Sequence, residues 1–214
     1  MPSEDYMDRD EQDERDDIID ADEDHGLVDD IVDEDTDLDD AEDTDDADDD
    51  TVTFASLGLP EEILEAVTDM GFRFPTPIQA AAIPPLLELR DVVGIAQTGT
   101  GKTAAFGLPL LAIVDADERD VQALVLAPTR ELAMQSAQAI EDFAARTARL
   151  DVVPAYGGSP YGPQIGALKR GAQVVVGTPG RVIDLIEKGA LDLSNVRMLV
   201  LDEADEMLRM GFAE

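Results

Sequence analysis

The chain has 214 residues, and 50 Asp and Glu residues against 15 Lys and Arg residues give it a formal net charge of −35. The absence of cysteine excludes disulfides, thiolate metal sites and a cysteine nucleophile. The single histidine, His25, excludes a histidine-based zinc site and a Ser-His-Asp triad. The N-terminus is acidic and no apolar run is long enough to span a bilayer, so we expect a cytoplasmic protein without a membrane segment.

The acidic residues are concentrated at the start of the chain. Residues 1–50 hold 28 acids and two arginines, a net charge of −26, whereas residues 51–214 carry −9. Self-repulsion and scarce apolar surface predict a disordered acidic tail over residues 1–52, followed by one domain over residues 53–214. Short apolar islands in the tail leave a second interpretation open, in which the tail docks onto a protein partner or competes with RNA for basic surfaces.

The first predicted element of the domain is a helix that begins at Pro60 and ends at Gly71, with two glutamates at its positive end. Short apolar runs then alternate with helical stretches. The predicted strands are Val92–Ala96, Val121–Ala127, Val152–Tyr156, Val174–Gly177 and Val196–Asp202. The predicted helices between them are Thr103–Val114, Glu131–Arg146, Gln164–Arg170 and Arg181–Lys188. Strands without polar alternation predict an α/β fold, a parallel sheet with helices on both faces, with ligands beyond the carboxyl ends of the strands.

The first of these strands leads directly into a glycine-rich turn and then into a helix, which is the context of a phosphate-binding loop. The loop residues are Ala96, Gln97, Thr98, Gly99, Thr100, Gly101, Lys102 and Thr103. We expect Lys102 to reach the β- and γ-phosphates of a nucleotide and the Thr103 hydroxyl to bind Mg²⁺. Ala96 replaces the first glycine of the general pattern, so the pattern alone leaves a coincidental match open.

A second half of a nucleotide site is predicted where the last strand ends in Asp202 and Glu203. Asp202 is placed to hold Mg²⁺, and Glu203 to orient and deprotonate an attacking water. The alternative is that the acidic pair only caps the following helix. Beside a phosphate loop, we expect catalytic roles for Lys102, Asp202 and Glu203.

Residues 202–205 read Asp-Glu-Ala-Asp, and with this motif the domain resembles the N-terminal motor domain of a DEAD-box ATP-dependent RNA helicase. The other matching motifs, in family order, are residues 71–79 with the upstream Phe54, residues 96–103, residues 128–133, Gly157-Gly158 and residues 178–181. Alanine is usual in the family's phosphate loop, so the departure at Ala96 disappears. Residues 206–212 are similar to those of bacterial cold-shock and ribosome-assembly members, and Met207, Leu208 and Met210 are expected in a helix core.

The resemblance implies a RecA-like fold that binds ATP and Mg²⁺. One amide of Gln79 can bond two edges of adenine and so select ATP over GTP, while Phe54 can stack on the base. Phe72 and Thr76, in the same motif, are implied as further nucleotide contacts, and Pro75 and Pro77 as a rigid turn that directs Gln79. Taken singly, Phe54 could instead be a core residue and Gln79 a surface helix residue.

The resemblance also implies an RNA site on loops that follow the strands. Its residues are Pro128, Thr129, Arg130, Gly157, Gly158, Thr178, Pro179, Gly180 and Arg181. Backbone N–H groups of the glycines and helix N-termini can hold phosphates there, and Arg130 and Arg181 would add positive charge. Such contacts read the sugar-phosphate backbone, so we expect sequence-independent binding of single strands or short duplexes. The alternatives are that Gly157-Gly158 forms a simple turn and that Arg181 is a surface charge.

No Ser-Ala-Thr tripeptide follows the DEAD motif, so we expect a fragment of a longer helicase whose sheet is incomplete at the C-terminal end and which lacks the second motor domain. The parent is expected to hydrolyse ATP to unwind RNA, and the fragment to bind nucleotide weakly without unwinding. A non-catalytic nucleotide- or RNA-binding adaptor whose acidic tail recruits a partner is the alternative for the fragment. Another strand-and-helix NTPase, such as a GTPase or a DNA translocase, is disfavoured by Gln79 and the RNA-type loops.

Overall fold

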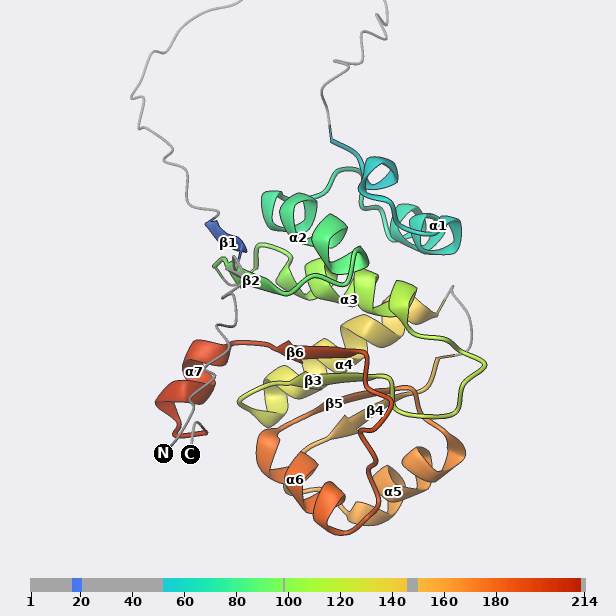
Figure 1. The fold of residues 1–214 in the computed structure, drawn as a ribbon, viewed down its shortest axis with the longest axis vertical. Coiled ribbons are helices and arrows are strands. Elements are labelled where there is room, and N and C mark those ends of the chain that lie inside the picture. Colours follow the sequence, from blue (N-terminus) through green and yellow to red (C-terminus); the bar gives the residue numbers. More distant parts are fainter. Residues whose placement is uncertain (1–16, 21–51, 98, 146–149, 213–214) are drawn as a thin grey trace, which may run out of the picture.

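The computed structural model describes residues 52–97, 99–145 and 150–212, together with the backbone of residues 17–20. Seven α-helices and one short 3-10 helix lie in the described part, with six strands (Figure 1). The helices are η1 (Phe54–Leu57), α1 (Glu61–Asp69), α2 (Pro77–Leu87), α3 (Lys102–Ile113), α4 (Arg130–Ala144), α5 (Tyr161–Arg170), α6 (Pro179–Glu187) and α7 (Ala204–Arg209). The strands are β1 (Asp17–Asp20), β2 (Val92–Ile95), β3 (Ala123–Leu126), β4 (Val152–Ala155), β5 (Val174–Gly177) and β6 (Met198–Leu201).

The strands form two parallel sheets. One sheet has four strands in the order β4-β5-β3-β6, and the other pairs β1 with β2. In the larger sheet, Val125 of β3 lies opposite Val176 of β5 and Val200 of β6. Because β2 does not pair with β6, the single sheet predicted from the sequence is divided, and a cleft of about 1070 Å³ is lined by both strands. The exposed side chains along these two strands are those of Val93, Ile95, Leu199 and Leu201.

Helices cover both faces of the four-stranded sheet, as the apolar strands predicted. Alternate strand residues define the two faces: Val125 and Val176 pack in the core under α1, α3 and α4, while Leu124 and Val175 pack with α5 and α6. Figure 1 shows α3 and α4 on one side of the sheet and α5 and α6 on the other. This two-layered burial fixes the register, because shifting a strand by one residue would exchange its faces.

Each of the five predicted strands and the predicted helices after Pro60 is present, with ends that differ by a few residues. The sequence did not predict α2, because two of its residues, Pro84 and Pro85, disfavour helix interiors. The expectation of a helix core at the chain's end is correct for Met207, which is buried, and wrong for Leu208 on the short α7 and for Met210 just after it, which are both exposed.

The predicted acidic tail lies outside the described residues except at Asp17–Asp20, whose backbone forms β1. Asp17 is paired with Val92 and Asp20 with Ile95 in a parallel register. Composition did not predict this strand; an unpaired edge of β2 supplies the backbone N–H and C=O groups that such a segment can bond. Within the described part, no helix has the length and apolar character needed to cross a membrane.

Candidate functional site

The loop between β2 and α3 has the backbone shape of a phosphate-binding loop. Gly99 and Gly101 have φ angles of 88° and 92°, in the left-handed region that glycine adopts without strain. The loop is also tied to itself, since Thr100 Oγ1 donates a hydrogen bond to the Gln97 carbonyl at 2.8 Å. The predicted Thr98 lies outside the described residues. The loop therefore turns sharply into the N-terminus of α3, where an anion is favoured.

Gln79 is held against this loop from α2. It is 2% exposed, its Oε1 accepts a hydrogen bond from Thr76 N at 2.9 Å, and its Nε2 donates to the Gly101 carbonyl at 3.2 Å. A Cβ on Gly101 would collide with Gln79 Nε2. Thr76 Oγ1 is buried and has no hydrogen-bond partner among the described residues. Gln79 is thus neither a surface residue nor a free amide, but part of the wall of the phosphate loop.

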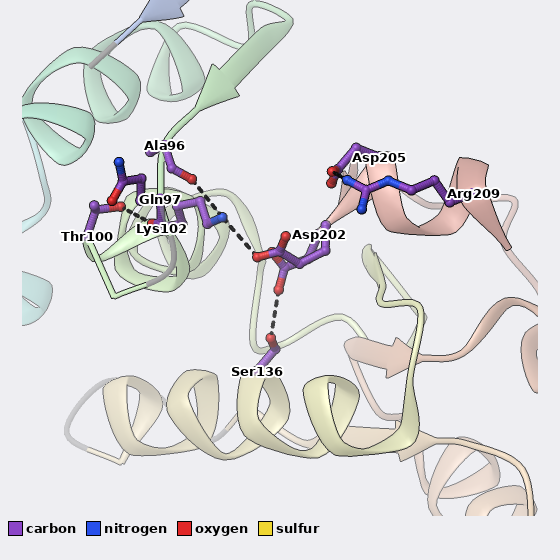
Figure 2. Close-up of polar contacts among 9 residues, drawn as sticks. Ala96, Gln97, Thr100, Lys102, Ser136, Asp202, Asp205 and Arg209 are labelled. Atoms are coloured by element: carbon purple, nitrogen blue, oxygen red, sulfur yellow. Dashed lines mark hydrogen bonds and ion pairs between the residues drawn. The ribbon is translucent and has the colours of Figure 1, made fainter. Parts of the chain in front are cut away.

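Lys102 joins the loop to the end of β6 (Figure 2). Its Nζ donates to the Ala96 carbonyl at 2.9 Å and lies 2.9 Å from Glu203 Oε1 in a partly exposed ion pair. Glu203 has a φ of 52°, a left-handed conformation that is costly for a non-glycine residue. The structure therefore brings the two halves of the predicted nucleotide site together, across 101 residues of sequence.

Asp202 lies beside this pair and receives a hydrogen bond on Oδ2 from Ser136 Oγ of α4, at 3.1 Å (Figure 2). Burial raises the pKa of the Asp202 carboxyl above its ordinary range, and the Ser136 hydrogen bond partly opposes this shift. Thr103 occupies the first turn of α3, half-buried. No cluster of three or more acidic or histidine side chains that could hold a metal occurs among the described residues.

The aromatic side chains of the predicted nucleotide motif differ in exposure. Phe54 is 5% exposed and belongs to the main core, where its ring meets that of Phe72 edge to face at 6.4 Å. Phe72 and Phe74 are exposed. The ring of Phe54 packs in the core, as the alternative interpretation expected, and in this structure it is not accessible for stacking on a base.

The predicted RNA residues gather around a second, shallow groove of about 630 Å³. Seven of the nine line it, together with Asp184 and Phe212, which the sequence did not single out. The seven are Pro128, Arg130, Gly157, Gly158, Thr178, Gly180 and Arg181. Thr129 and Pro179 stand at the starts of α4 and α6, where Thr129 Oγ1 accepts a hydrogen bond from Leu132 N at 3.3 Å. Loops after three strands therefore meet in one groove that two helix N-termini adjoin.

The two arginines of this groove differ in their surroundings. Arg130 is exposed, with its guanidinium 4.8 Å from the centre of the Tyr156 ring. Arg181 is 7% exposed, which contradicts the alternative of a simple surface charge, and its guanidinium bonds to the Ser159 carbonyl and to Gln164 Oε1. These acceptors draw Arg181 into the protein interior.

Ser136, Ser159, Tyr161 and Gln164 were not predicted as site residues. Ser136 and Gln164 are buried polar residues on helices. A polar side chain on the apolar face of a helix usually has a buried hydrogen-bond partner. Ser136 lies on such a face, between Ala133 and Ile140, so its position indicates a buried partner. Its partner, 66 residues away, could not be read from the sequence.

Comparisons with known proteins give a consistent result. A family model described as DEAD/DEAH box helicase matches residues 76–214. The chain is 59% identical over 165 residues to the ATP-dependent RNA helicase DeaD of Haemophilus influenzae, covering 77% of this chain and 27% of that protein. It is 58% identical over 162 residues to the DeaD protein of Mycobacterium tuberculosis H37Rv, covering 76% and 29%.

Solved structures show the same similarity. A DEAD box protein from Methanococcus jannaschii matches with a TM-score of 0.71 and 46% identity over 75% of this chain and 44% of that one. A hypothetical ATP-dependent RNA helicase from Sulfolobus tokodaii matches with a TM-score of 0.66 and 42% identity, over 72% and 44%. The RecA-like fold that the resemblance implied is thereby confirmed. The chain spans about a quarter of the length of the curated relatives it matches.

Proposed function

Because this chain belongs to the DEAD/DEAH box helicase family, we propose that residues 53–214 are the nucleotide- and RNA-binding motor domain of an ATP-dependent RNA helicase. The observation that carries the proposal is the double contact of the phosphate loop. Gln79 bonds the loop at Gly101 on one side, and Glu203 pairs with its Lys102 on the other. A loop joined to both a base-reading amide and an acidic pair suits a nucleoside triphosphate.

The residues present fit Mg·ATP. Thr76 Oγ1 is a buried hydroxyl without a partner among the described residues, and Gly99 and Gly101 leave the backbone open where side chains would intrude. The N-terminus of α3 and Lys102 supply positive charge for phosphates. Thr103 and Asp202 supply the oxygen ligands that Mg²⁺ prefers. To hold the adenine beside Thr76, the Gln79 amide would exchange its bonds to Thr76 N and the Gly101 carbonyl for the base, with the exposed ring of Phe72 nearby in the motif.

Bound Mg·ATP supplies a γ-phosphoryl group whose charge the metal helps to neutralise. The residues of this chain would then act around it. Lys102 exchanges Glu203 for phosphate oxygens, which frees the Glu203 carboxylate to accept a proton from water. Asp202 would serve as a ligand in its ionised form; burial raises the pKa of its carboxyl and opposes ionisation, and the hydrogen bond from Ser136 partly offsets this shift. The first turn of α3 holds the phosphates through backbone N–H groups.

We assign the RNA backbone to the groove of about 630 Å³. The exposed Arg130, the paired glycines and the starts of α4 and α6 offer one positive charge and several backbone N–H groups to phosphates. Such donors do not read base edges, which supports sequence-independent binding.

The test is nucleotide binding by residues 1–214, followed with a fluorescent ATP analogue in the presence of Mg²⁺. Lys102→Ala is expected to abolish binding, because it removes the only loop cation among the described residues. Lys169→Ala is the matched control, since Lys169 is an exposed lysine in the last turn of α5. Equal affinity for Lys102→Ala and Lys169→Ala would contradict the nucleotide site.

For the whole helicase we propose ATP-driven unwinding or remodelling of RNA duplexes, a role that agrees with the name of the relatives, ATP-dependent RNA helicase. Residues 1–214 alone are expected to leave a labelled duplex intact, and appreciable unwinding would contradict the need for a second motor domain. Three further expectations stay predictions: membership of the cold-shock and ribosome-assembly subfamily, a cytoplasmic location, and a protein partner for the acidic tail. An adaptor that binds without hydrolysis is the alternative for the fragment.

A further inference from the structure

Arg181 lines the groove, but its side chain is buried and its guanidinium is bonded to protein acceptors, whereas Arg130, the other arginine of the groove, is exposed. We propose that Arg181 is a positioning residue: it shapes the Gly157-Gly158 loop through Ser159 and Gln164 and makes no contact with phosphate. The inference rests on the proposed RNA groove, and it assigns the direct positive charge of that groove to Arg130.

Both terminal nitrogens of the Arg181 guanidinium donate to protein acceptors, while its buried Nε has no partner among the described residues. Nη1 and Nη2 both donate to the Ser159 carbonyl at 3.1 Å, and Nη1 also donates to Gln164 Oε1 at 2.8 Å. One face of the guanidinium lies 4.1 Å from the centre of the Tyr161 ring. An arginine suits this place because its partners are all acceptors and its planar fork can bond two of them at once.

A second layer of hydrogen bonds transmits this contact to both ends of the glycine pair. Gln164 Nε2 donates to Ser159 Oγ at 2.7 Å and to the Tyr156 carbonyl at 3.4 Å. Ser159 Oγ donates to the same Tyr156 carbonyl at 3.2 Å. Tyr156 and Ser159 flank Gly157 and Gly158, so the network fixes the residues on each side of two that have little conformational preference of their own.

The loop needs such a brace. Gly158 has a φ of 79° and lies against the Arg130 guanidinium, while a Cβ on Gly157 would meet no atom within 4 Å, so packing does not hold Gly157. Free glycines lose more backbone entropy than other residues when a ligand orders them. A loop already shaped by Arg181 would present its N–H groups to phosphate without that cost.

The same network joins the two helices beneath the groove. Tyr161, at the start of α5, donates a hydrogen bond from its hydroxyl to Asp184 Oδ2 of α6 at 2.8 Å, and its ring carries the Arg181 contact. Arg181 itself is in the first turn of α6, next to Thr178 and Gly180. The loop after β4 and the loop after β5 are therefore set relative to each other by one buried side chain.

Salt dependence distinguishes positioning from phosphate contact. A cation that touches phosphate releases a counterion, so its removal lowers the slope of log affinity against log salt by about 0.7 for a single strand. Removal of a buried cation that only shapes a loop lowers the affinity for RNA at every salt concentration and leaves the slope of log affinity against log salt unchanged. Arg130→Gln and Arg181→Gln remove the same charge from the same groove and are a matched pair.

The experiment measures binding of a fluorescein-labelled ten-nucleotide oligouridylate to residues 1–214 by anisotropy, from about 50 to about 300 mM NaCl. Arg130→Gln is expected to lower the slope by about 0.7, whereas Arg181→Gln lowers affinity roughly tenfold without changing the slope. Arg181→Lys keeps the charge but loses the planar fork, so it is expected to bind as weakly as Arg181→Gln. An equal loss of slope in both glutamine variants, or full binding by Arg181→Lys, would overturn the positioning role.

Gln164→Leu keeps the inference testable if Arg181 variants do not fold, because it removes the second layer without touching a charge. It is expected to reproduce the tenfold loss with an unchanged slope, and its thermal unfolding shows whether the domain is intact; wild-type affinity in a folded Gln164→Leu protein would overturn the positioning role. A wild-type chain that does not bind RNA, or an Arg130→Gln variant that binds like wild type, would instead contradict the proposed RNA groove.

Discussion

Lys102 Nζ lies 2.9 Å from Glu203 Oε1, so the cation of the phosphate loop and the carboxylate of the acidic pair neutralise each other. Both side chains are about one quarter exposed, and solvent therefore weakens the pair. The same lysine is the group expected to meet phosphate and the same glutamate the group expected to meet water. Binding a triphosphate must separate them, so the ion pair competes with the ligand.

Glu203→Gln is expected to tighten nucleotide binding, because it removes the competitor for Lys102. The gain should be about two- to fivefold, the range for a partly exposed ion pair. It can be measured by titrating a fluorescent ATP analogue into the wild-type and variant chains. Glu118→Gln is the control, since it breaks an ion pair with Arg197, which the structure places outside the nucleotide loop. Weaker binding by Glu203→Gln would mean that the carboxylate supports the nucleotide instead of competing with it.

Gln79→Ala is expected to weaken ATP by about tenfold while leaving GTP little changed, if the amide reads adenine. The structure adds a second effect: the amide also holds Gly101 and Thr76, so some loss for both nucleotides should accompany the selective loss. Competition titrations with ATP and GTP separate the two effects. An equal loss for both nucleotides would contradict the adenine-reading role and leave only the loop contact.

The raised pKa of Asp202 predicts a pH-dependent stability. Burial favours the neutral acid, so the folded state binds a proton more tightly than the unfolded chain, whose aspartates have an ordinary pKa of 3.8. Above the folded-state pKa, the ionised Asp202 carboxylate therefore lowers the free energy of unfolding. This destabilisation disappears as the pH falls through the folded-state pKa toward the ordinary value. Asp202→Asn is expected to raise the melting temperature by about 2 °C at about pH 8, with a smaller gain at about pH 5.

Asp192 provides a control of opposite sign. Hydrogen bonds from the Ser194 hydroxyl and backbone hold the pKa of this exposed carboxyl below its ordinary range. The Asp192 carboxylate therefore stabilises the folded state above the pKa that it has in the unfolded chain. This stabilisation is lost as the pH falls through the pKa of the folded state, so Asp192→Asn should lower the melting temperature at neutral pH. Melting curves at several pH values that show the same trend for both variants would contradict the assigned cause at Asp202.

Deletion of residues 1–50 is expected to strengthen RNA association at low salt, because it removes a net charge of −26. The effect should fade as salt screens the charges. Anisotropy with labelled single-stranded RNA measures it, and a full-length chain whose tail acids are replaced by their amides is the control. If the deletion strengthens RNA binding equally at high salt, the tail acts through a specific contact and not through long-range electrostatic repulsion of RNA.

The strands and most helices could be predicted from the sequence because buried apolar runs and glycine or proline boundaries report local environment. The helix α2 could not, since Pro84 and Pro85 oppose it locally and packing decides the outcome. The meeting of the phosphate loop and the acidic pair at one site was predicted from two motifs at the ends of strands, whereas the ion pair of Lys102 with Glu203 was not. These parts of the fold and site depend on patterns that lie close together in the chain.

Other features depend on three-dimensional contacts that no local pattern encodes. Arg181 looks like a surface charge in the sequence, yet Ser159 and Gln164 draw it inward. Ser136 reaches Asp202 from a helix 66 residues earlier. Phe54 and Gln79 are both buried, although a binding role predicts access. Burial and hydrogen-bond partners, rather than residue type, decide which candidate can meet a ligand directly.

The cleft between β2 and β6 means that the phosphate loop and the acidic pair are carried by two separately hydrogen-bonded sheets. Among the described residues, no ladder bond spans the cleft. The Lys102–Glu203 ion pair joins the loop to the acidic pair, and α3 also contacts β6. A ligand that engages both the phosphate loop and the acidic pair would therefore join two sheets that share no ladder hydrogen bonds and that are otherwise connected through the packing of α3.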